Sequence, residues 1–312
     1  MRVLLTGAHG MLGSSLLTAW ISARPSDTVV PVGRDRVDLR DRSATAALLA
    51  EERPDAIIHA AATVGGIAAK LANPTRYLLD NLLLDSSLVG AAIDARVPEL
   101  LYIGSAAVYP EHYRQPFIET DLLAAPLEVA NEGYAIAKIA GTKLCEYASA
   151  EFGLDYRVAV PSNLYGPGDD FSESHGHLIS AVLGKLHTAT LDRAPLVEIW
   201  GDGTARREFT YAPDLADWLV SQIGRLGSWP PMINIGVGVD LSIAEYYEAA
   251  RLVTGYSGDF SFDTSRPAGV HQRILDSTAA RALGWAPSTS LEDGMASAYA
   301  SFVDTHERRV RA

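Results

Sequence analysis

The sequence predicts an α/β protein built on a doubly wound parallel sheet, with a second and smaller region toward the C-terminus. In the first half of the chain, short β-branched apolar runs alternate with longer segments of helical periodicity, as in a sheet covered by helices on both faces. A glycine-rich segment, TGAHGMLG, joins the first apolar run to the first helical segment. From about residue 165 onward the loops become longer and richer in Gly and Pro, which indicates the second region.

The elements follow from these patterns in chain order. Short apolar runs bounded by turn residues predict strands at residues 2–6, 28–32, 56–60, 100–103 and 156–159. Longer periodic segments between them predict helices at residues 11–23, 43–52, 76–95 and 134–152. We expect one domain over residues 1–165 and about 208–240, and a second over about 166–207 and 241–312.

Composition excludes several classes of function. The 312-residue chain has a net charge of −12 and no basic stripe, so a nucleic-acid partner is not expected. Its single cysteine, Cys145, permits no intrachain disulfide and lacks the neighbours of a zinc site, so no metal is expected. The first residues do not form a signal peptide, and no run approaches the roughly 18–20 apolar residues of a membrane span. We expect a cytoplasmic protein without a membrane partner.

Gly7, Gly10 and Gly13 lie between the first strand and the first helix. Glycine there permits a tight turn and lets the backbone approach a pyrophosphate, which binds at the N-terminus of the helix. The glycines alone would fit a simple turn, but the strand before them and the helix after them favour a Rossmann-type dinucleotide site. Met11 and Leu12, in the same turn, are expected to contact the dinucleotide. The first domain is therefore expected to bind the cofactor.

The end of the second strand indicates which dinucleotide binds. An NAD site usually carries an acidic residue there, whereas this chain has Gly33 and Arg34. An arginine pairs with a 2′-phosphate, so NADP(H) is favoured over NAD, although a solvated loop arginine beside Asp35 would look the same. Asp38 follows where an adenine contact would lie.

Tyr134 and Lys138 are spaced i and i+4, hence on one helix face, and Ser105 ends the fourth strand about 30 residues earlier. A lysine one turn from a tyrosine is expected to lower the pKa of the phenol and to hold the nicotinamide ribose. Ser105 would bind the same carbonyl oxygen as the tyrosine. A surface helix also produces this spacing, but together with the glycine loop the set predicts a carbonyl reductase or its reverse.

Several segments follow one another as in the extended short-chain dehydrogenase/reductases: TGAHGMLG, HAAATVGGI, GSAAVYP, NEGYAIAKIAGTKLCE, PSNLYGPGD, WGDGTARREF and INIGVGVD. The chain most resembles the GDP-L-fucose synthases, from residue 1 to about 305. VGGI and YAIAKIAGTKLCE are specific to that subgroup. In it, a 4-keto-6-deoxy sugar nucleotide is epimerised at C3 and C5 and then reduced at C4 by NADPH.

The resemblance implies a role for each matched residue. Tyr134 would protonate the C4 alkoxide, Lys138 would assist it, and Ser105 would orient the ketone. Asn163 and Leu164 would lie against the nicotinamide and the substrate. The positions that hold the base and the diphosphate correspond to Lys185, Trp200, Arg207 and Arg273. Lysine at 185 replaces the family's usual arginine and lacks its bidentate fork.

The family's epimerisation uses a cysteine two residues after the serine and a histidine in the substrate loop. His177 matches the histidine, but the cysteine position is Ala107, which cannot carry a proton. Cys145 matches a separate cysteine of the family and is expected to pack in the core, whereas His175 is a candidate second acid or base. His177 would contact a substrate hydroxyl or retain part of its acid–base role.

We therefore hypothesise an NADPH-dependent 4-ketoreductase of an NDP-4-keto-6-deoxyhexose without C3/C5 epimerisation. The nucleotide would be dTDP or GDP, with a slight preference for dTDP and a 6-deoxyallose-type product as one candidate. The alternatives are a true GDP-L-fucose synthase, an NAD-retaining sugar-nucleotide 4-epimerase and a non-catalytic NADPH-binding protein. The helices at 76–95 and 134–152 are expected to form a homodimer interface, as in the family.

Overall fold

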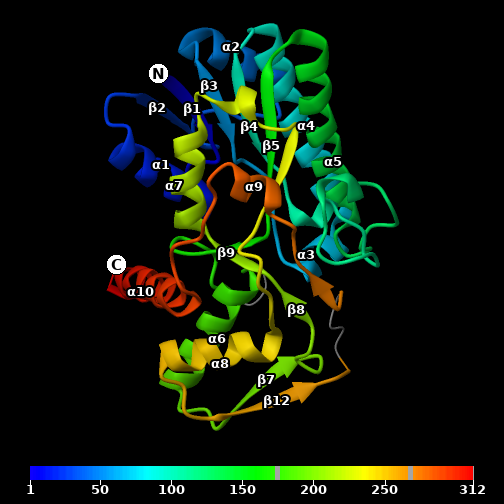
Figure 1. Cartoon of the computed structure of the whole chain (residues 1–312). Coiled ribbons are helices and arrows are strands. Elements are labelled where there is room, and N and C mark those ends of the chain that lie inside the picture. Colours follow the sequence, from blue (N-terminus) through cyan, green and yellow to red (C-terminus); the bar gives the residue numbers. More distant parts are fainter. Residues whose placement is uncertain (173–175, 266–269, 312) are drawn as a thin grey trace.

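The computed structural model describes residues 1–172, 176–265 and 270–311, and it confirms the predicted fold class. Its centre is a six-stranded sheet in the order β10-β5-β4-β3-β1-β2, with every neighbouring pair parallel (Figure 1). Chain order reverses between β1 and β3, the kind of switch point where ligands bind at the carboxyl ends of strands. The strands are β1 (Arg2–Thr6), β2 (Thr28–Val32), β3 (Ala56–His59), β4 (Glu99–Ile103), β5 (Asp155–Pro161) and β10 (Met232–Ile235).

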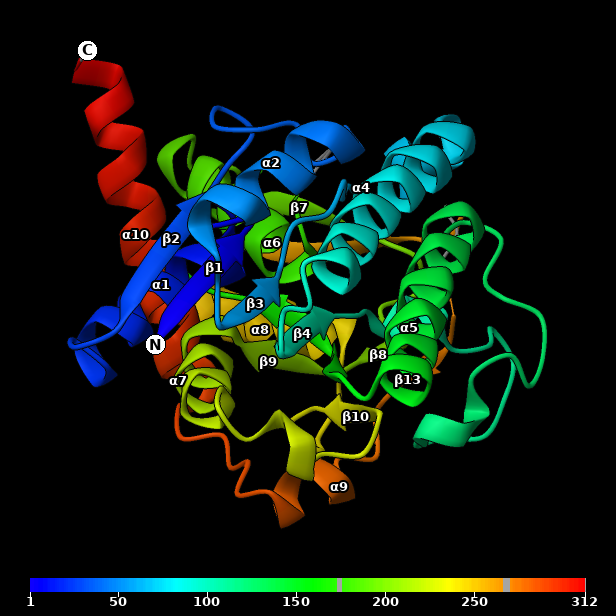
Figure 2. The same cartoon turned by 90° about the horizontal axis from the view of Figure 1, so that it is seen from above.

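Helices cover both faces of this sheet (Figure 2). Successive residues of β1 enter different cores, because side chains alternate across a strand. Leu4 packs in the core formed with α2, α4 and α5, whereas Val3 and Leu5 pack in the core formed with α1 and α7. The helices are α1 (Met11–Ala23), α2 (Arg42–Glu52), α4 (Pro74–Asp94), α5 (Glu132–Phe152) and α7 (Ala212–Gln222).

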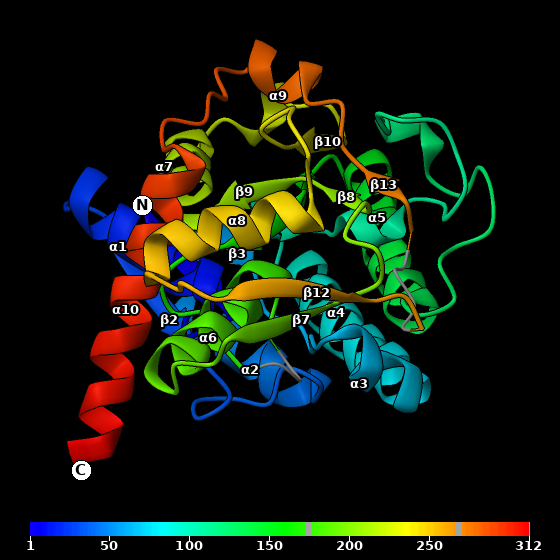
Figure 3. The same ribbon diagram turned by 90° about the horizontal axis from the view of Figure 1, so that it is seen from below.

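A third core lies below the sheet, in the region made from later parts of the chain (Figure 3). It joins α6 (Leu178–Leu191), α8 (Ile243–Thr254) and α10 (Leu291–Arg311) to the parallel pair β7 (Leu196–Trp200) and β12 (Asp259–Asp263). Smaller elements connect the two regions: α3 (Ile67–Ala72), β6 (Asn163–Tyr165), β8 (Arg206–Arg207), β9 (Phe209–Tyr211), β11 (Leu241–Ser242), β13 (Gln272–Arg273) and α9 (Thr278–Ala282).

The predicted elements of the first half are present, and most boundaries differ by one or two residues. Asp41 starts α2 because its carboxylate accepts hydrogen bonds from the N–H groups of Ser43 and Ala44. Pro74 occupies the first turn of α4, where its missing N–H is tolerated. Gly153 ends α5 in the left-handed conformation, at φ 68°. Within the described residues, no helix combines the length and apolar character needed to cross a bilayer.

Candidate functional site

The glycine turn between β1 and α1 is shaped by close backbone packing. A Cβ at Gly13 would lie 2.0 Å from the carbonyl oxygen of Gly7, and one at Gly7 would lie 2.7 Å from the backbone of Ala60 and Ala61. Gly7 also has φ +69°, which L side chains rarely adopt. Gly10 is the N-cap of α1 and brings no capping side chain to the first turn, where Met11 and Leu12 lie. This bare helix N-terminus fits the pyrophosphate of a dinucleotide.

The loop after β2 lies against this turn. A Cβ at Gly33 would lie 2.4 Å from the ring of His9, so the loop and the turn are in close contact here. Arg34, the next residue, is exposed, and an exposed arginine here is accessible to a 2′-phosphate. Asp38 is exposed as well, and hydrogen bonds from Arg40 lower the pKa of its carboxyl to about 2. The adenine contact of Asp38 stays a prediction.

Ser105 and Tyr134 meet, although they come from β4 and α5. Ser105 follows β4 and caps a short 3₁₀ helix, its Oγ accepting a hydrogen bond from the N–H of Ala107 at 3.2 Å. Tyr134 is only 7% exposed, and the side chain of Ser105 lies close enough to act on the pKa of its phenol. Ala107 packs in the same apolar cluster as Tyr134. Ser105, Tyr134 and Ala107, the alanine at the position of the family's cysteine, are therefore close together.

The pKa of Tyr134 is raised rather than lowered, so the prediction drawn from the spacing of Tyr134 and Lys138 is wrong. Burial raises the pKa of Tyr134 to about 12; the hydrogen bond with Ser105 opposes the shift and the charge of Asp85 adds to it. The Lys138 ammonium lies 3.8 Å from Asp85 Oδ2 and 4.3 Å from the ring centroid of Tyr102. Burial also lowers the pKa of Lys138, against the attraction of Asp85. The charge of Lys138 is thus directed to a carboxylate in this structure.

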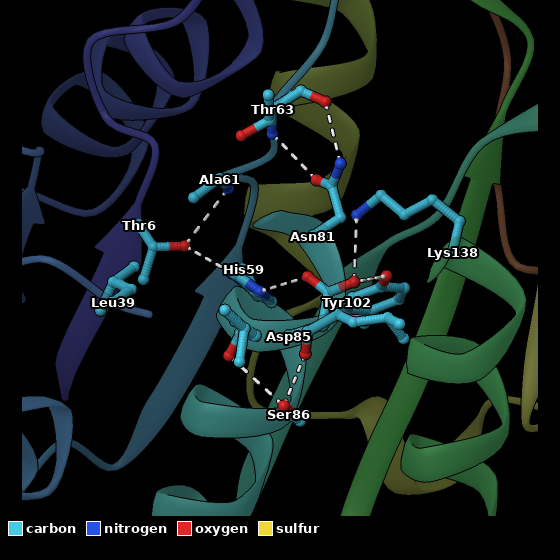
Figure 4. A network of polar contacts seen from close by, with 12 residues as sticks. Thr6, Leu39, His59, Ala61, Thr63, Asn81, Asp85, Ser86, Tyr102 and Lys138 are labelled. Atoms are coloured by element: carbon cyan, nitrogen blue, oxygen red, sulfur yellow. Dashed lines mark hydrogen bonds and ion pairs between the residues drawn. The ribbon is translucent and has the colours of Figure 1, made fainter. Parts of the chain in front are cut away.

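Asp85 is the centre of a buried set of polar side chains that the sequence did not reveal (Figure 4). Asp85 accepts a hydrogen bond from Tyr102 at 2.5 Å and faces His59 Nε2 at 3.1 Å. The other ring nitrogen of His59 lies 2.7 Å from the hydroxyl of Thr6, the last residue of β1. We call His59, Asp85, Tyr102 and Lys138 the Asp85 network. A signal existed: a histidine ends the otherwise apolar strand AIIH.

A second set of polar side chains lies beside Tyr134. Lys70 Nζ is 4.6 Å from the centroid of the Tyr134 ring and donates a hydrogen bond to Asn131 at 2.9 Å. Asn131 donates to Glu128 at 2.6 Å, and Glu128 pairs with Arg273 at 3.3 Å. Arg207 acts electrostatically on the same pair. We call these residues the Glu128 cluster: Lys70, Glu128, Asn131, Arg207 and Arg273.

The two arginines of this cluster were predicted, and the structure brings them together. Burial and the charge of Arg273 lower the pKa of Arg207 to about 10. Arg273 is 7% exposed and donates a hydrogen bond to the carbonyl of Ala106 at 3.2 Å. It therefore lies next to the segment that holds Ser105. Sequence reasoning missed Lys70, Glu128 and Asn131, since nothing in their local pattern connects them.

The predicted residues of the second region are more dispersed. His177 is the N-cap of α6, and its Nδ1 lies 3.0 Å from the carboxylate of Asp169. Asn163, in β6, donates to the carbonyl of Glu208 at 3.2 Å, and Leu164 packs against the core under α1 and α7. Lys185 donates to the carbonyl of Glu198 at 2.8 Å, and Trp200 ends β7 half exposed. His175 lies outside the described residues.

Comparison with known proteins gives consistent matches. The profile of the "NAD dependent epimerase/dehydratase family" matches residues 3–236. A GDP-L-fucose synthase from Azorhizobium caulinodans is 38% identical over 98% of this chain and 97% of its own. A GDP-L-colitose synthase from Yersinia pseudotuberculosis is 40% identical over 95% of this chain and 96% of its own.

Solved structures agree with the sequence relatives. A GDP-6-OMe-4-keto-L-xylo-heptose reductase from C. jejuni has a TM-score of 0.88 at 27% identity, covering 97% of this chain and 98% of its own. A GDP-mannoheptose C4 reductase from Campylobacter jejuni, solved with NADP bound, has a TM-score of 0.87 at 28% identity, with the same coverage. The matches bear out the expected family, the enzyme class and, since relatives bind NADP, the NADP(H) cofactor.

Proposed function

The chain belongs to the NAD dependent epimerase/dehydratase family, and we propose that it is an NADPH-dependent 4-ketoreductase of a GDP-linked 4-keto-6-deoxyhexose. One observation carries the proposal: the side chains of Tyr134 and Ser105 interact beside Ala107, at the carboxyl end of the sheet that carries the glycine turn. The pair can hold and protonate a carbonyl oxygen, and the alanine leaves no acid or base where epimerisation would need one.

The two hydroxyls would act on the same atom of the substrate. NADPH, when bound, supplies the hydride that reaches C4. Ser105 donates a hydrogen bond to the C4 carbonyl oxygen and stabilises the charge that develops on it. Tyr134 gives its proton to that oxygen, so the Tyr134 O–H bond breaks while the product hydroxyl forms. The phenolate left on Tyr134 then takes a proton from solvent.

The charge of the Glu128 cluster supports a sugar-nucleotide substrate. Lys70, Arg207 and Arg273 bring cationic groups to a largely buried place, where Glu128 is the carboxylate in contact with Arg273. Such an excess of buried positive charge suits a diphosphate, which arginine binds through paired hydrogen bonds. We therefore propose that Arg207 and Arg273 bind the diphosphate of the substrate.

GDP is preferred to dTDP because the named relatives carry GDP in their substrates or products. The slight preference for dTDP that we drew from the sequence receives no support from them.

Turnover in D₂O tests the proposal. The enzyme is supplied with NADPH and a GDP- or dTDP-linked 4-keto-6-deoxyhexose, and deuterium in the product is located by NMR, with no-enzyme controls. We expect NADPH consumption without enzyme-dependent deuterium at C3 or C5. Enzyme-dependent label at either carbon would contradict the absence of epimerisation, and failure to consume NADPH with either nucleotide would remove the reductase assignment.

Restoring the cysteine sharpens this test. Ala107→Cys places a thiol in the cluster that holds Tyr134, and His177 is present with its Asp169 partner. We expect the variant to gain enzyme-dependent deuterium at C3 or C5 while it keeps C4 reduction. Ala107→Ser is the matched control, because its hydroxyl has similar size and does not ionise near neutral pH. Equal label in the two variants would contradict the role given to position 107.

A GDP-L-fucose synthase is the second candidate. The hydrogen-bonded pair of His177 and Asp169 favours it, because a histidine held by a carboxylate can act as an acid or base. Identities of 38–40% with GDP-L-fucose and GDP-L-colitose synthases agree with it. Label at C3 and C5 in the wild-type product, lost in His177→Gln, would establish this candidate.

We also propose a homodimer through α4 and α5. The two helices pack side by side (Figure 2). Both expose large apolar side chains, Leu79 and Leu83 on α4 and Ile136 and Tyr147 on α5. Exposed apolar groups gathered on one helix pair are typical of an interface. Leu83→Glu should convert the dimer to a monomer in light scattering, whereas Leu252→Glu, an exposed leucine of α8, should not.

A further inference from the structure

Tyr134 has two lysines near it, and they differ in what balances their charge. Lys138 faces Asp85 at 3.8 Å inside the Asp85 network. Lys70, from the short helix α3, reaches the face of the Tyr134 ring and is held by the amide oxygen of Asn131. Among the ion pairs of the described residues, none includes Lys70. Lys70 is therefore the cation near the phenol whose charge no contacting carboxylate balances.

The surroundings of Lys70 hold its ammonium in place. Asn131, at the N-cap of α5, accepts from Lys70 and donates to Glu128, so one amide links the two. Glu128 is in turn held by Arg273 of β13. The charged groups that act on Lys70 are thus Glu128, which favours the protonated amine, and Arg273, which opposes it. This chain of contacts holds Lys70 over the ring.

We propose that Lys70 is a positioning residue that stabilises the phenolate of Tyr134 when its proton passes to the substrate oxygen. The inference rests on the function proposed above, because it needs Tyr134 to be the proton donor. In that step the Tyr134 O–H bond breaks, its electron pair stays on the phenolic oxygen, and the proton forms the C4 hydroxyl after hydride has reached carbon. A cation over the ring attracts the phenolate more strongly than the neutral phenol, so it lowers the barrier to transfer.

Tyr134 needs a stabilising charge if it is to give up its proton. Burial raises the pKa of Tyr134 to about 12, so the phenol is a weak acid, and Lys138 is directed toward Asp85. Lys70 supplies positive charge from the ring face, without a carboxylate in contact with it. The cysteine that the family places at position 107 is an alanine here, and that alanine packs against the same tyrosine.

The reaction should depend on the protonation of Lys70. Burial lowers its pKa to about 8, against the attraction of Glu128 and helped by the repulsion of Arg273. The protonated amine is the active form, so the rate should be full below pH 8 and fall as pH rises through about 8. Tyr134 itself stays protonated over this range, since its pKa is about 12.

Three lysine variants test this: Lys70→Met, Lys70→Arg and, as control, Lys143→Met on the outer face of α5, where Lys143 pairs with Glu146. The profile of kcat and KM is measured from pH 6 to 10 with NADPH and the 4-keto substrate that the wild type reduces. We expect Lys70→Met to lower kcat at pH 7 by roughly 10–100-fold and to lose the decline near pH 8. Lys70→Arg should keep most of kcat and move the decline to higher pH, and the control should match the wild type.

Other outcomes separate the inference from the function. A wild-type enzyme that reduces no 4-keto sugar nucleotide overturns both. A wild type that works, with Lys70→Met unchanged in kcat or altered only in KM, overturns the inference alone, as does an unshifted decline in Lys70→Arg. NADPH binding and thermal melting check that each variant is folded, and Lys70→Arg keeps the test open if the methionine variant is not.

Lysine titration gives a readout independent of turnover. The chain has only four lysines, so their Cε–H NMR signals can be assigned with the same variants. We expect the Lys70 signal to titrate near pH 8 and to shift in Tyr134→Phe only slightly, because the ring remains. A Lys70 signal that titrates above pH 10 would contradict the pH dependence assigned to it.

Discussion

The Asp85 network and the Glu128 cluster both adjoin Tyr134, yet they are organised in opposite ways. In the Asp85 network one buried lysine meets one buried carboxylate, and burial lowers the pKa of His59, which favours its neutral ring. In the Glu128 cluster three cationic side chains share the neighbourhood of Glu128. The first arrangement is electrically complete and holds groups in position. The second carries excess positive charge and suits an anionic substrate.

Tyr134 is the residue on which both clusters act, and removing its hydroxyl should have the largest effect. We expect Tyr134→Phe to lower kcat by about 10³-fold while NADPH binding stays within twofold, because the proton donor is lost and the ring is kept. Stopped-flow or steady-state loss of NADPH absorbance measures the rate. Tyr147→Phe, on the exposed face of the same helix, is the control. Unchanged turnover in Tyr134→Phe would remove the mechanism.

Breaking the balanced cluster should affect stability first. Burial raises the pKa of Asp85, but Lys138, His59 and Tyr102 outweigh it and hold that pKa below the usual 3.8. The stabilisation is therefore present above about pH 3.8 and is lost as pH falls. Asp85→Asn leaves Lys138 as an unpaired buried charge, and we expect it to lower the free energy of unfolding by about 3–5 kcal/mol.

Urea unfolding at pH 7 measures this loss against a matched variant. Asp94→Asn lies on the same helix and removes an exposed ion pair with Arg42, so it should change stability by about 0–1 kcal/mol. An equal loss of unfolding free energy in both variants would contradict the stabilising role assigned to the Asp85 network.

Weakening the unbalanced cluster should affect substrate binding more than folding. Arg207→Met removes one cation from the Glu128 cluster, and we expect KM for the sugar nucleotide to rise by roughly 10–100-fold with kcat changed less. Arg206→Met is a close control, because Arg206, the neighbour of Arg207 on β8, is paired with Asp240 and Glu245. Initial rates over a range of substrate concentrations give KM for both variants. Equal KM values would contradict the binding of the diphosphate by Arg207.

The smallest expected effect is at Lys185, outside both clusters. Lys185→Arg restores the bidentate fork typical of the family. We expect KM for a GDP-linked substrate to fall by about twofold to fivefold, since an exposed charged contact contributes up to about 1 kcal/mol. The dTDP-linked substrate should respond less. A larger gain with dTDP would argue against GDP as the nucleotide.

Local patterns in the sequence predicted what depends on neighbours along the chain. The glycine turn, its strand and its helix fell at the predicted residues, because strand and helix periods and the space needed by Gly7 and Gly13 are local properties. The spacing of Tyr134 and Lys138 placed both on α5. The pKa of Tyr134 depends on the tertiary structure, and the prediction failed because burial raises it and because Asp85, on another helix, pairs with Lys138.

The sequence by itself determined the alternation of strands and helices along the chain, the cofactor turn and the identity of the serine, the tyrosine and the alanine at the site. Only the tertiary structure decided which polar side chains surround them. Lys70, Glu128 and Arg273 come from three segments far apart in the sequence, and His59 and Asp85 from two more. Packing of the sheet and helices brings them together, and burial then sets their charges, which no period or spacing along the chain encodes.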